Sequence, residues 1–155
     1  MALKLKAMTS NDLVAFLRDC IPYYAGMMLD VGEYPDYDAA YSQAYHEIMS
    51  YFSNGQVPST ELLYNMVESD SGENVGSLWL SMITREEEPL IFISYITVKD
   101  KFRRRGYAAS ALEVAEKMLL PHGFEKYELY VFVNNVGAVQ LYQRLGYDIV
   151  DKKAQ

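Results

Sequence analysis

Apolar residues in the first half of the chain recur with two different periods, and each period predicts a different element. Residues 3–8 alternate between apolar and polar side chains, as a half-buried strand does. Residues 9–12 read Thr-Ser-Asn-Asp, a capping-box spacing that predicts the start of a helix, and Pro22 is expected to end or bend this helix. A second helix is predicted over residues 38–52, because apolar and aromatic side chains recur there at three- and four-residue steps. The face that they form contains Tyr41, Ala44, Tyr45, Ile48, Met49 and Phe52.

The second half of the chain is rich in strand-like segments. Strands are predicted over residues 61–68, 75–83, 90–98, 127–133 and 147–150, and helices over residues 108–120 and 137–145. Asp70, Ser71 and Gly72 are turn residues between the first two of these strands, which are therefore expected to pair in antiparallel. The whole order, βααβββαβαβ, predicts one α/β domain over residues 1–155, with a mixed sheet and helices on both faces.

The composition supports a globular domain and limits the kinds of site that it can carry. Half of the 155 residues are hydrophobic and 23% are charged, which is typical of a chain that buries a core. Cys20 is the only cysteine, and His46 and His122 have no partner at metal-ligand spacing, so no disulfide and no metal site are expected. The first six residues lack the apolar core of a signal peptide or membrane span, and we expect a soluble, cytoplasmic protein.

A basic run over residues 99–105 is the most informative segment. It holds five of the fourteen Lys and Arg residues in a chain whose formal net charge is −7. An apolar strand precedes it, and Gly106 and a predicted helix follow it. The first turn of a helix has unpaired N–H groups and a positive dipole, and glycine lets a ligand approach the backbone. This succession predicts a site for a phosphate-bearing cofactor. The acidic net charge argues against nucleic acid as the main partner, and an isolated nucleic-acid patch is the alternative interpretation of the run.

Two motifs resemble the signatures of the GNAT superfamily of N-acetyltransferases. Residues 103–108, Arg-Arg-Arg-Gly-Tyr-Ala, fit the cofactor signature Arg/Gln-x-x-Gly-x-Gly/Ala that follows the fourth strand of that fold. Residues 135–138, Asn-Val-Gly-Ala, fit the second signature together with Leu141-Tyr142 and Gly146-Tyr147. The resemblance extends over about residues 76–147. It implies the GNAT acyl-CoA N-acyltransferase fold, an α/β fold with a mixed, largely antiparallel sheet and helices on both faces.

The same resemblance implies acetyl-CoA as the acyl-donor cosubstrate. Its pyrophosphate is expected on the backbone N–H groups at the helix N-terminus, and at least one of the three arginines is expected to reach the phosphates. The pantetheine arm is expected along the strand over residues 90–98, where that strand parts from residues 127–133, with Asn135 on the opposite wall. The predicted cofactor-binding residues are Ile96, Val98, Arg103, Arg104, Arg105, Gly106, Tyr107, Ala108, Asn135 and Ala138.

Tyr142 is the catalytic residue that the resemblance implies. It would lie beside the cofactor sulfur, where its hydroxyl could protonate the leaving thiolate. A backbone N–H group of the parted strand could polarise the thioester carbonyl, as an oxyanion-hole donor does. The chain shows no positioned nucleophile, so we expect direct attack by the acceptor amine without a covalent enzyme intermediate.

The general base is where this chain departs from many members of the superfamily. They often place Asp or Glu near the end of the fourth strand, and residues 94–97 of this chain read Ser-Tyr-Ile-Thr. Three explanations stay open. A carboxylate from another strand could act through water, Tyr95 or a water chain could serve, or the amine could arrive neutral. The carboxylates considered for the first explanation are Glu68, Glu73 and Glu128.

The resulting hypothesis is an N-acetyltransferase that moves an acetyl group from acetyl-CoA to a primary amine. The acidic surface mildly favours a cationic acceptor, such as a polyamine, an aminoglycoside, an amino acid or a protein amine. A non-catalytic acyl-CoA-binding sensor is the alternative, and a transferase of longer acyl groups is a third interpretation. We expect neither nucleic acid nor membrane as a partner. The oligomeric state stays open, with a homodimer as one option.

Overall fold

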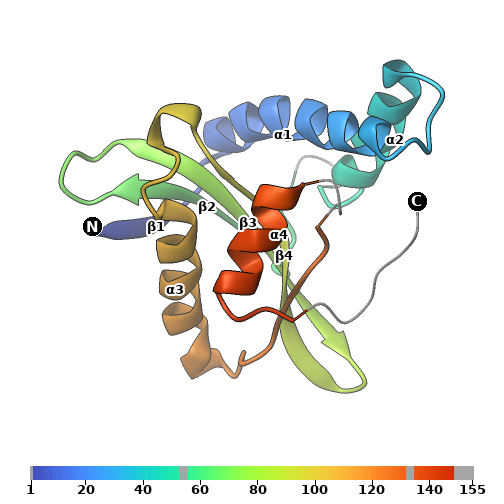
Figure 1. Ribbon diagram of the computed structural model, residues 1–155. Helices are drawn as coiled ribbons and strands as arrows, with labels where there is room; N and C mark the ends of the chain where they lie inside the picture. Colours follow the sequence, from blue (N-terminus) through green and yellow to red (C-terminus); the bar gives the residue numbers. More distant parts are fainter. Residues whose placement is uncertain (1, 53–55, 132–134, 149–155) are drawn as a thin grey trace. The chain divides into compact units, whose positions relative to one another are not determined.

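The computed structural model describes residues 2–52, 56–131 and 135–148 (Figure 1). The elements are β1 (Leu3–Ala7), α1 (Ser10–Asp30), α2 (Tyr37–Met49), β2 (Glu61–Glu68), β3 (Asn74–Arg85), β4 (Glu88–Val98), η2 (Asp100–Phe102), α3 (Tyr107–Leu119), η3 (Leu120–His122), β5 (Tyr127–Leu129) and α4 (Val136–Arg144). They form two compact units. The first consists of Met1–Leu13 and Pro58–Tyr130, and the second of Val14–Val57 and Val131–Gln155.

A five-stranded sheet forms the centre of the first unit, with its strands side by side in chain order (Figure 1). Neighbouring strands from β1 to β4 pair in antiparallel, whereas β4 and β5 pair in parallel. The predicted class, a mixed and largely antiparallel sheet, is thereby confirmed. β2 has the predicted bounds. β3 and β4 are longer than predicted, because their pairing continues to a two-residue turn at Glu86 and Glu87.

Helical segments lie against both faces of this sheet, as predicted. The strand registers place Asn65 of β2 and Tyr127 of β5 on opposite faces. The Asn65 side-chain amide donates to the Asp12 carboxylate in the first turn of α1, over 3.1 Å. On the other face, the Tyr127 hydroxyl donates to the carbonyl of Ala115 in α3, over 3.5 Å.

The core of the first unit lies between α3 and the sheet face that it covers. Apolar side chains recur along α3 with helical spacing, and burying them excludes water from that face. The buried residues of α3 are Tyr107, Ala111, Leu112, Ala115 and Leu119. On β3, a Cβ atom at Gly76 would lie 2.2 Å from the carbonyl oxygen of Thr97 on β4. Only glycine therefore allows β3 and β4 to approach closely at the end of β4.

The first helix begins as predicted but does not end where it was expected to. The Thr9 N–H donates to the Asp12 carboxylate and the Asp12 N–H to the Thr9 hydroxyl, which forms the predicted capping box. α1 then continues through Pro22 to Asp30, so the prediction that Pro22 could end the helix is wrong. Proline removes one backbone hydrogen bond. Buried residues before and after Pro22, among them Cys20 and Ala25, hold the helix together through packing.

The second helix buries only part of the face that was predicted. Asp36 caps α2, with its side chain accepting from the Ala39 N–H. The buried residues of α2 are Ala40, Ala44 and Ile48. Tyr41 and Tyr45 were expected on the same face, but they are 38% and 44% exposed. The aromatic rings stack on each other along the outside of the helix, with 6.4 Å between their centroids.

Two predicted strands reach residues that the structure does not describe. The strand predicted over residues 127–133 is β5, Tyr127–Leu129, and residues 132–134 lie outside the described part. Of the strand predicted over residues 147–150, residues 147 and 148 are described and are not in a strand, while 149 and 150 lie outside. The short helix before it is α4, Val136–Arg144, as predicted to within one residue at each end.

Candidate functional site

A β-bulge interrupts β4 in the middle of the first unit. Trp79 on β3 is in register with Tyr95, but the next residue of β3, Leu80, is in register with Ile93. Ser94 is therefore an extra residue on β4. A bulge of this kind redirects side chains and reverses which backbone groups face each neighbouring strand. The sequence contains no local signal for it, because the register is set by the whole hairpin.

β4 parts from β5 at the same point. The parallel pairing ends at Ile93 and Leu129, although β4 continues to Val98. Near that end the Lys99 N–H donates to a carbonyl of β3, and backbone groups alternate along a strand. The polar backbone groups of Ile96 and Val98 therefore face away from β3, toward the side on which β5 has parted. This orientation is the one that the predicted contacts of these two residues with a pantetheine arm require.

The loop that follows β4 presents backbone N–H groups at the start of α3. Arg104 and Gly106 both have positive φ, +65° and +80°. Arg105, between them, is not among the residues with positive φ, so the sign of φ alternates over these three residues. Such alternation turns successive backbone N–H groups toward a common point, where they can bind an anion. No side chain caps α3, and its first backbone hydrogen bond runs from the Ser110 N–H to the Gly106 carbonyl. Within the described chain, the N–H groups of residues 107–109 therefore have no intrahelical acceptor and are available to a ligand.

The basic side chains around this loop have different roles. The Arg103 side chain donates through Nε to the Val98 carbonyl over 2.9 Å and lies 3.1 Å from the Asp100 carboxylate, so it braces the loop. The Arg105 guanidinium lies 5.8 Å from the centroid of the Phe102 ring. Arg104 is exposed and forms no ion pair with the described residues, which leaves its charge available to a phosphate group.

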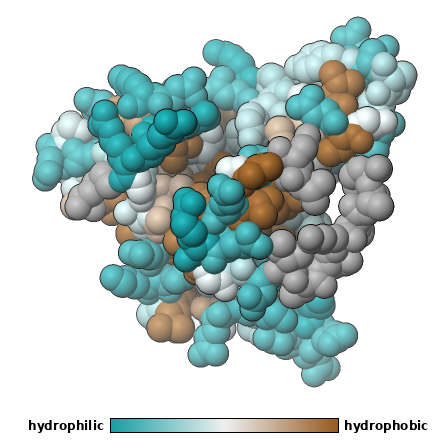
Figure 2. Space-filling view, in the orientation of Figure 1, coloured by the Kyte–Doolittle hydropathy of each residue, from teal (hydrophilic) through white to brown (hydrophobic). Residues whose placement is uncertain are grey.

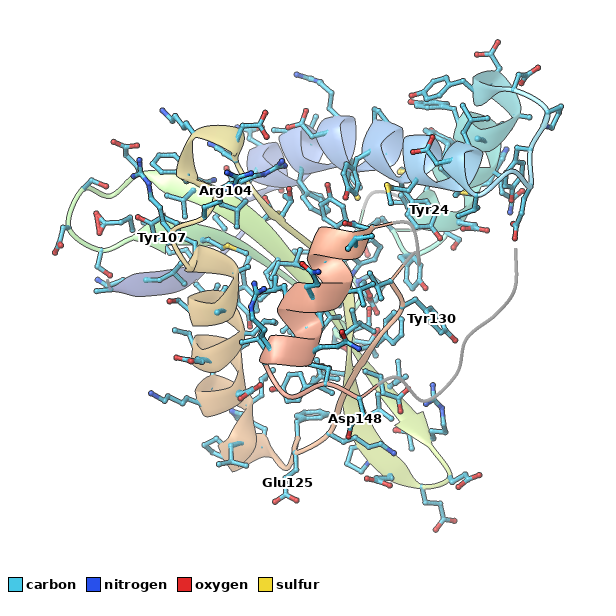
Figure 3. All side chains as sticks on the ribbon, viewed as in Figure 1. Tyr24, Arg104, Tyr107, Glu125, Tyr130 and Asp148 are labelled. Carbon is cyan, nitrogen blue, oxygen red and sulfur yellow. The ribbon has the colours of Figure 1, made fainter. Side chains whose placement is uncertain are left out.

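The figures show how these groups are presented. Arg104 and Tyr107 lie at the N-terminal end of α3 (Figure 3). The Tyr107 ring is buried and meets the Phe102 ring edge-on, so only its backbone N–H is available to a ligand. Strongly hydrophilic residues gather over the loop that joins η2 to α3 (Figure 2). The predicted residues 96, 98 and 103–108 are thus brought together in one unit.

A buried carboxylate that the sequence analysis did not single out lies behind the bulge. Glu61, the first residue of β2, is 8% exposed, and its neighbour in register, Ser81, is 4% exposed. The Glu61 carboxylate accepts from the Ser81 hydroxyl and, over 2.9 Å, from the Trp79 indole. The Ser81 hydroxyl lies 2.7 Å from the hydroxyl of Ser94, the bulged residue. A Glu at the start of a strand gives no sign of burial in the sequence, and only the registers of three strands bring these groups together.

The carboxylates that the sequence suggested as bases have other contacts. The Glu68 carboxylate accepts from the backbone N–H groups of Asp70 and Ser71 in the β2–β3 turn, and these bonds lower its pKa. Glu128 pairs with Arg85 and lies 3.9 Å from the Lys126 ammonium. Glu73 is exposed in the turn. Among the described residues, no group of three or more His, Cys, Asp or Glu side chains is arranged to hold a metal ion.

The second unit carries the other predicted site residues. The Tyr142 side chain is buried, and burial, together with the nearby Tyr23, raises its pKa to about 12. Its hydroxyl is therefore protonated at neutral pH and can act as a proton donor. Asn135 caps α4, and its side-chain oxygen accepts from the Ala138 N–H over 3.3 Å. The spacing of these two residues in the motif thus has a local explanation, and their contacts with a cofactor stay a prediction.

Comparison with known proteins identifies the family. Residues 27–147 match the acetyltransferase (GNAT) family. The chain belongs to this family, as the two motifs predicted. It is 30% identical to the uncharacterised N-acetyltransferase YdgE of Bacillus subtilis strain 168 over 149 residues, which cover 95% of this chain and 92% of that protein. It is also 30% identical to the mycothiol acetyltransferase of Corynebacterium jeikeium strain K411 over 83 residues, 54% of this chain and 20% of that protein.

Solved structures show the same fold. The acetyltransferase-family protein YycN of Bacillus subtilis superimposes with a TM-score of 0.91 at 21% sequence identity, over 99% of this chain and 97% of that one. An aminoglycoside acetyltransferase from an uncultured soil metagenomic sample, in complex with sisomicin, gives a TM-score of 0.64 at 16% identity, over 99% and 93% of the two chains. None of the described helices is long and apolar enough to span a membrane.

Proposed function

We propose that this protein transfers an acetyl group from acetyl-CoA to a primary amine by direct attack. The observation that carries the proposal is the continuity of one segment in the first unit. The bulged β4 parts from β5, exposes the backbone of Ile96 and Val98, and leads directly into a basic loop at the uncapped start of α3. These features fit the two ends of a CoA molecule. The amides of the arm need backbone partners, and the pyrophosphate needs N–H groups and positive charge.

Each part of the segment has a separate task in holding the donor. The N–H groups of residues 107–109 and the charge of Arg104 bind the pyrophosphate, while Arg103 keeps the loop in place through the Val98 carbonyl. Backbone groups of Ile96 and Val98 hold the pantetheine amides. An N–H group of β4 near the bulge stabilises the negative charge that develops on the thioester oxygen. Tyr142, whose buried hydroxyl is protonated at neutral pH, donates the proton to the departing thiolate.

The acceptor is proposed to be a cationic amine. The formal net charge of −7 attracts cations to the protein as a whole. The basic run over residues 99–105 is proposed to bind the phosphates of acetyl-CoA and not the acceptor. An amine must lose its proton before it attacks, so a proton acceptor on the enzyme would allow the cationic form of the acceptor to be used directly.

A non-catalytic acyl-CoA-binding module is the second candidate. The observation in its favour is that residues 94–97 of β4 contain no carboxylate. Such a module would bind acetyl-CoA through the same loop but would release no free CoA in the presence of amines. Turnover therefore separates the two candidates.

The experiment that tests the proposal is a calorimetric titration with acetyl-CoA. The native protein is expected to bind it, and Gly106→Asp is expected to bind at least about tenfold more weakly, because a carboxylate at the helix N-terminus repels the pyrophosphate. Gly123→Asp is the matched control. Gly123 also has a positive φ, +91°, and open space around its Cβ position, but it follows η3 at the other end of α3. A native protein that does not bind acetyl-CoA would overturn the proposal.

A further inference from the structure

The hydrogen bonds behind the bulge run in one direction. A carboxylate can only accept, so the Ser81 hydroxyl gives its single proton to Glu61. The Ser81 oxygen must then accept in its 2.7 Å contact with Ser94, which makes the Ser94 hydroxyl the donor. No other described residue donates to the Ser94 oxygen, so its lone pairs are available to an external donor. The three side chains thus form a chain of hydroxyl groups that ends on a carboxylate.

The outer end of this chain lies where the proposed chemistry takes place. Ser94 is the bulged residue and follows Ile93, the last residue of β4 that pairs with β5. Its side chain is half-buried, whereas Ser81 and Glu61 are buried. Glu61 is therefore largely shielded from solvent, and the hydrogen bonds that connect its carboxylate to the point where the strands part run through the two serines.

The surroundings of Glu61 are neutral. Three groups donate to its carboxylate, namely the Thr60 hydroxyl over 2.8 Å, the Trp79 indole and the Ser81 hydroxyl. None of these groups titrates near neutral pH, and no cationic side chain among the described residues forms an ion pair with Glu61. At the outer end, Ser94 is flanked by Tyr95, which is in register with Trp79. A proton that arrives along the chain of hydroxyl groups would find an acceptor in this carboxylate.

We propose that Ser94, Ser81 and Glu61 form a proton relay that deprotonates the acceptor amine. The ammonium group of the acceptor donates to the Ser94 oxygen, the Ser94 proton passes to Ser81, and the Ser81 proton passes to the Glu61 carboxylate. One N–H bond of the ammonium breaks and one O–H bond forms on Glu61, so that a neutral amine and a neutral carboxylic acid result. After product release the proton returns to water by the reverse path. This inference rests on the proposed function, and it supplies the base that β4 itself lacks.

In this scheme Ser94 is the residue that touches the substrate, while Ser81 and Glu61 act through it. Glu61→Gln is the decisive variant, because a glutamine oxygen can still accept from Trp79 and Ser81 but cannot take up the proton. We expect kcat/KM to fall about 100-fold at pH 7, within the usual range for loss of acid–base catalysis. Activity is measured as release of the free CoA thiol with the best acceptor from a panel of spermidine, sisomicin, lysine and a lysine-containing peptide.

The pH profile separates a relay from a structural role. The native enzyme uses the ammonium form of the acceptor, so its kcat/KM is expected to change little between about pH 7 and 9. The Glu61→Gln variant can use only the fraction of the amine that has already lost its proton to water. Its kcat/KM is therefore expected to rise about tenfold per pH unit toward the amine pKa of about 10, and the gap to the native enzyme closes. A structural defect alone would lower kcat/KM by the same factor at every pH.

Two serine variants complete the test. Ser94→Ala removes the outer end of the relay and is expected to reproduce the steep pH profile, and Ser94→Thr, which keeps a hydroxyl group, is expected to restore much of the loss. Ser77→Ala is the matched control, since Ser77 also lies on β3 and is not hydrogen-bonded to this group of side chains. Calorimetry with acetyl-CoA is run on each variant, and unchanged binding is expected.

The possible failures are distinguishable. A native enzyme that turns over, with a Glu61→Gln variant whose loss is the same at every pH or absent, overturns the relay and leaves the proposed function intact. A native protein that binds acetyl-CoA but acetylates no amine of the panel contradicts the relay and the proposed transferase function, and favours the binding module. A native protein that does not bind acetyl-CoA contradicts the relay, the transferase function and the binding module.

Discussion

Arg104 takes a backbone conformation that an arginine side chain does not favour. Its φ of +65° lies in the left-handed region, which costs a non-glycine residue of order 1 kcal/mol. Gly106, two residues later, takes a similar conformation without that cost. The strain is explained if the residue at position 104 must combine this conformation with a positive side chain, because the first turns the backbone N–H groups and the second attracts phosphate. A glycine at position 104 would provide only the first.

The catalytic role proposed for Tyr142 can be tested at the level of a single hydroxyl group. Tyr142→Phe keeps the buried ring and its edge-on contact with Tyr147, whose centroid is 5.7 Å away. We expect kcat to fall about 100-fold, while the affinity for acetyl-CoA changes less than about twofold, because the hydroxyl acts on the leaving thiolate. Stopped-flow thiol release and calorimetry measure the two quantities. Equal losses in both would assign Tyr142 to binding.

The pKa of Tyr142 also predicts how kcat depends on pH. Burial raises it to about 12, so the acid form persists well above neutral pH. A falling limb of kcat that depends on Tyr142 is therefore expected only near pH 12. Since the pKa of an unfolded tyrosine is about 10, the same burial stabilises the fold below pH 10, and this contribution is lost as the pH rises toward 12. An alkaline limb centred near neutral pH would assign the proton donor to another group.

At the scale of elements, the β3–β4 hairpin carries strain without a functional reason that the structure reveals. Glu86 and Glu87 form its two-residue turn, with φ values of +53° and +67°. Both central residues of such a turn need positive φ, which favours Asn-Gly. We expect the double substitution Glu86→Asn, Glu87→Gly to raise the free energy of unfolding by about 1 kcal/mol.

Denaturant unfolding measures the effect on the hairpin, and a second variant isolates its cause. Glu86→Gln with Glu87→Gln removes the same two charges but keeps residues that disfavour positive φ. If the gain came from reduced repulsion in a chain of net charge −7, the glutamine pair would reproduce it. We expect the glutamine pair to gain less than half as much.

The elements also show what local sequence can and cannot predict. The capping box at Thr9 and the turn at residues 70–72 depend on neighbouring residues and were predicted correctly. Tyr41 and Tyr45 were assigned to the buried face of α2 because tyrosine counts as apolar in a periodic pattern, although its polar end also suits an exposed surface. Pro22 was expected to end or bend the first helix. The helix continues through it because tertiary packing, which local sequence does not show, holds the residues on both sides.

The residues of the candidate site also fall into those that local sequence predicts and those that only the tertiary structure brings together. The loop over residues 103–108 follows one strand and precedes one helix, so its motif could be recognised in the sequence. The bulge at Ser94 and the burial of Glu61 arise from the register of β2, β3 and β4, which no local pattern records. The absence of a carboxylate on β4 is therefore visible in the sequence, whereas the buried position of Glu61 is not.

For the whole molecule, the question is whether the two compact units behave as one domain. The boundary between them falls inside α1, after Leu13, and the family match over residues 27–147 includes parts of both. The predicted acetyl-CoA residues also fall in both units, with residues 96–108 in the first and Asn135 and Ala138 in the second. A single domain over residues 1–155 therefore remains our prediction, and its cooperativity is measurable.

We expect differential scanning calorimetry to show one transition, because the continuous helix α1 runs through both units. Acetyl-CoA at about 100 times its Kd should then raise the free energy of unfolding by about 2.7 kcal/mol and move the whole transition to higher temperature. Gly106→Asp should show the same single transition without the shift, and Gly123→Asp should keep the shift. Two transitions, of which acetyl-CoA moves only one, would instead show that the units unfold independently and that the ligand is held by one of them alone.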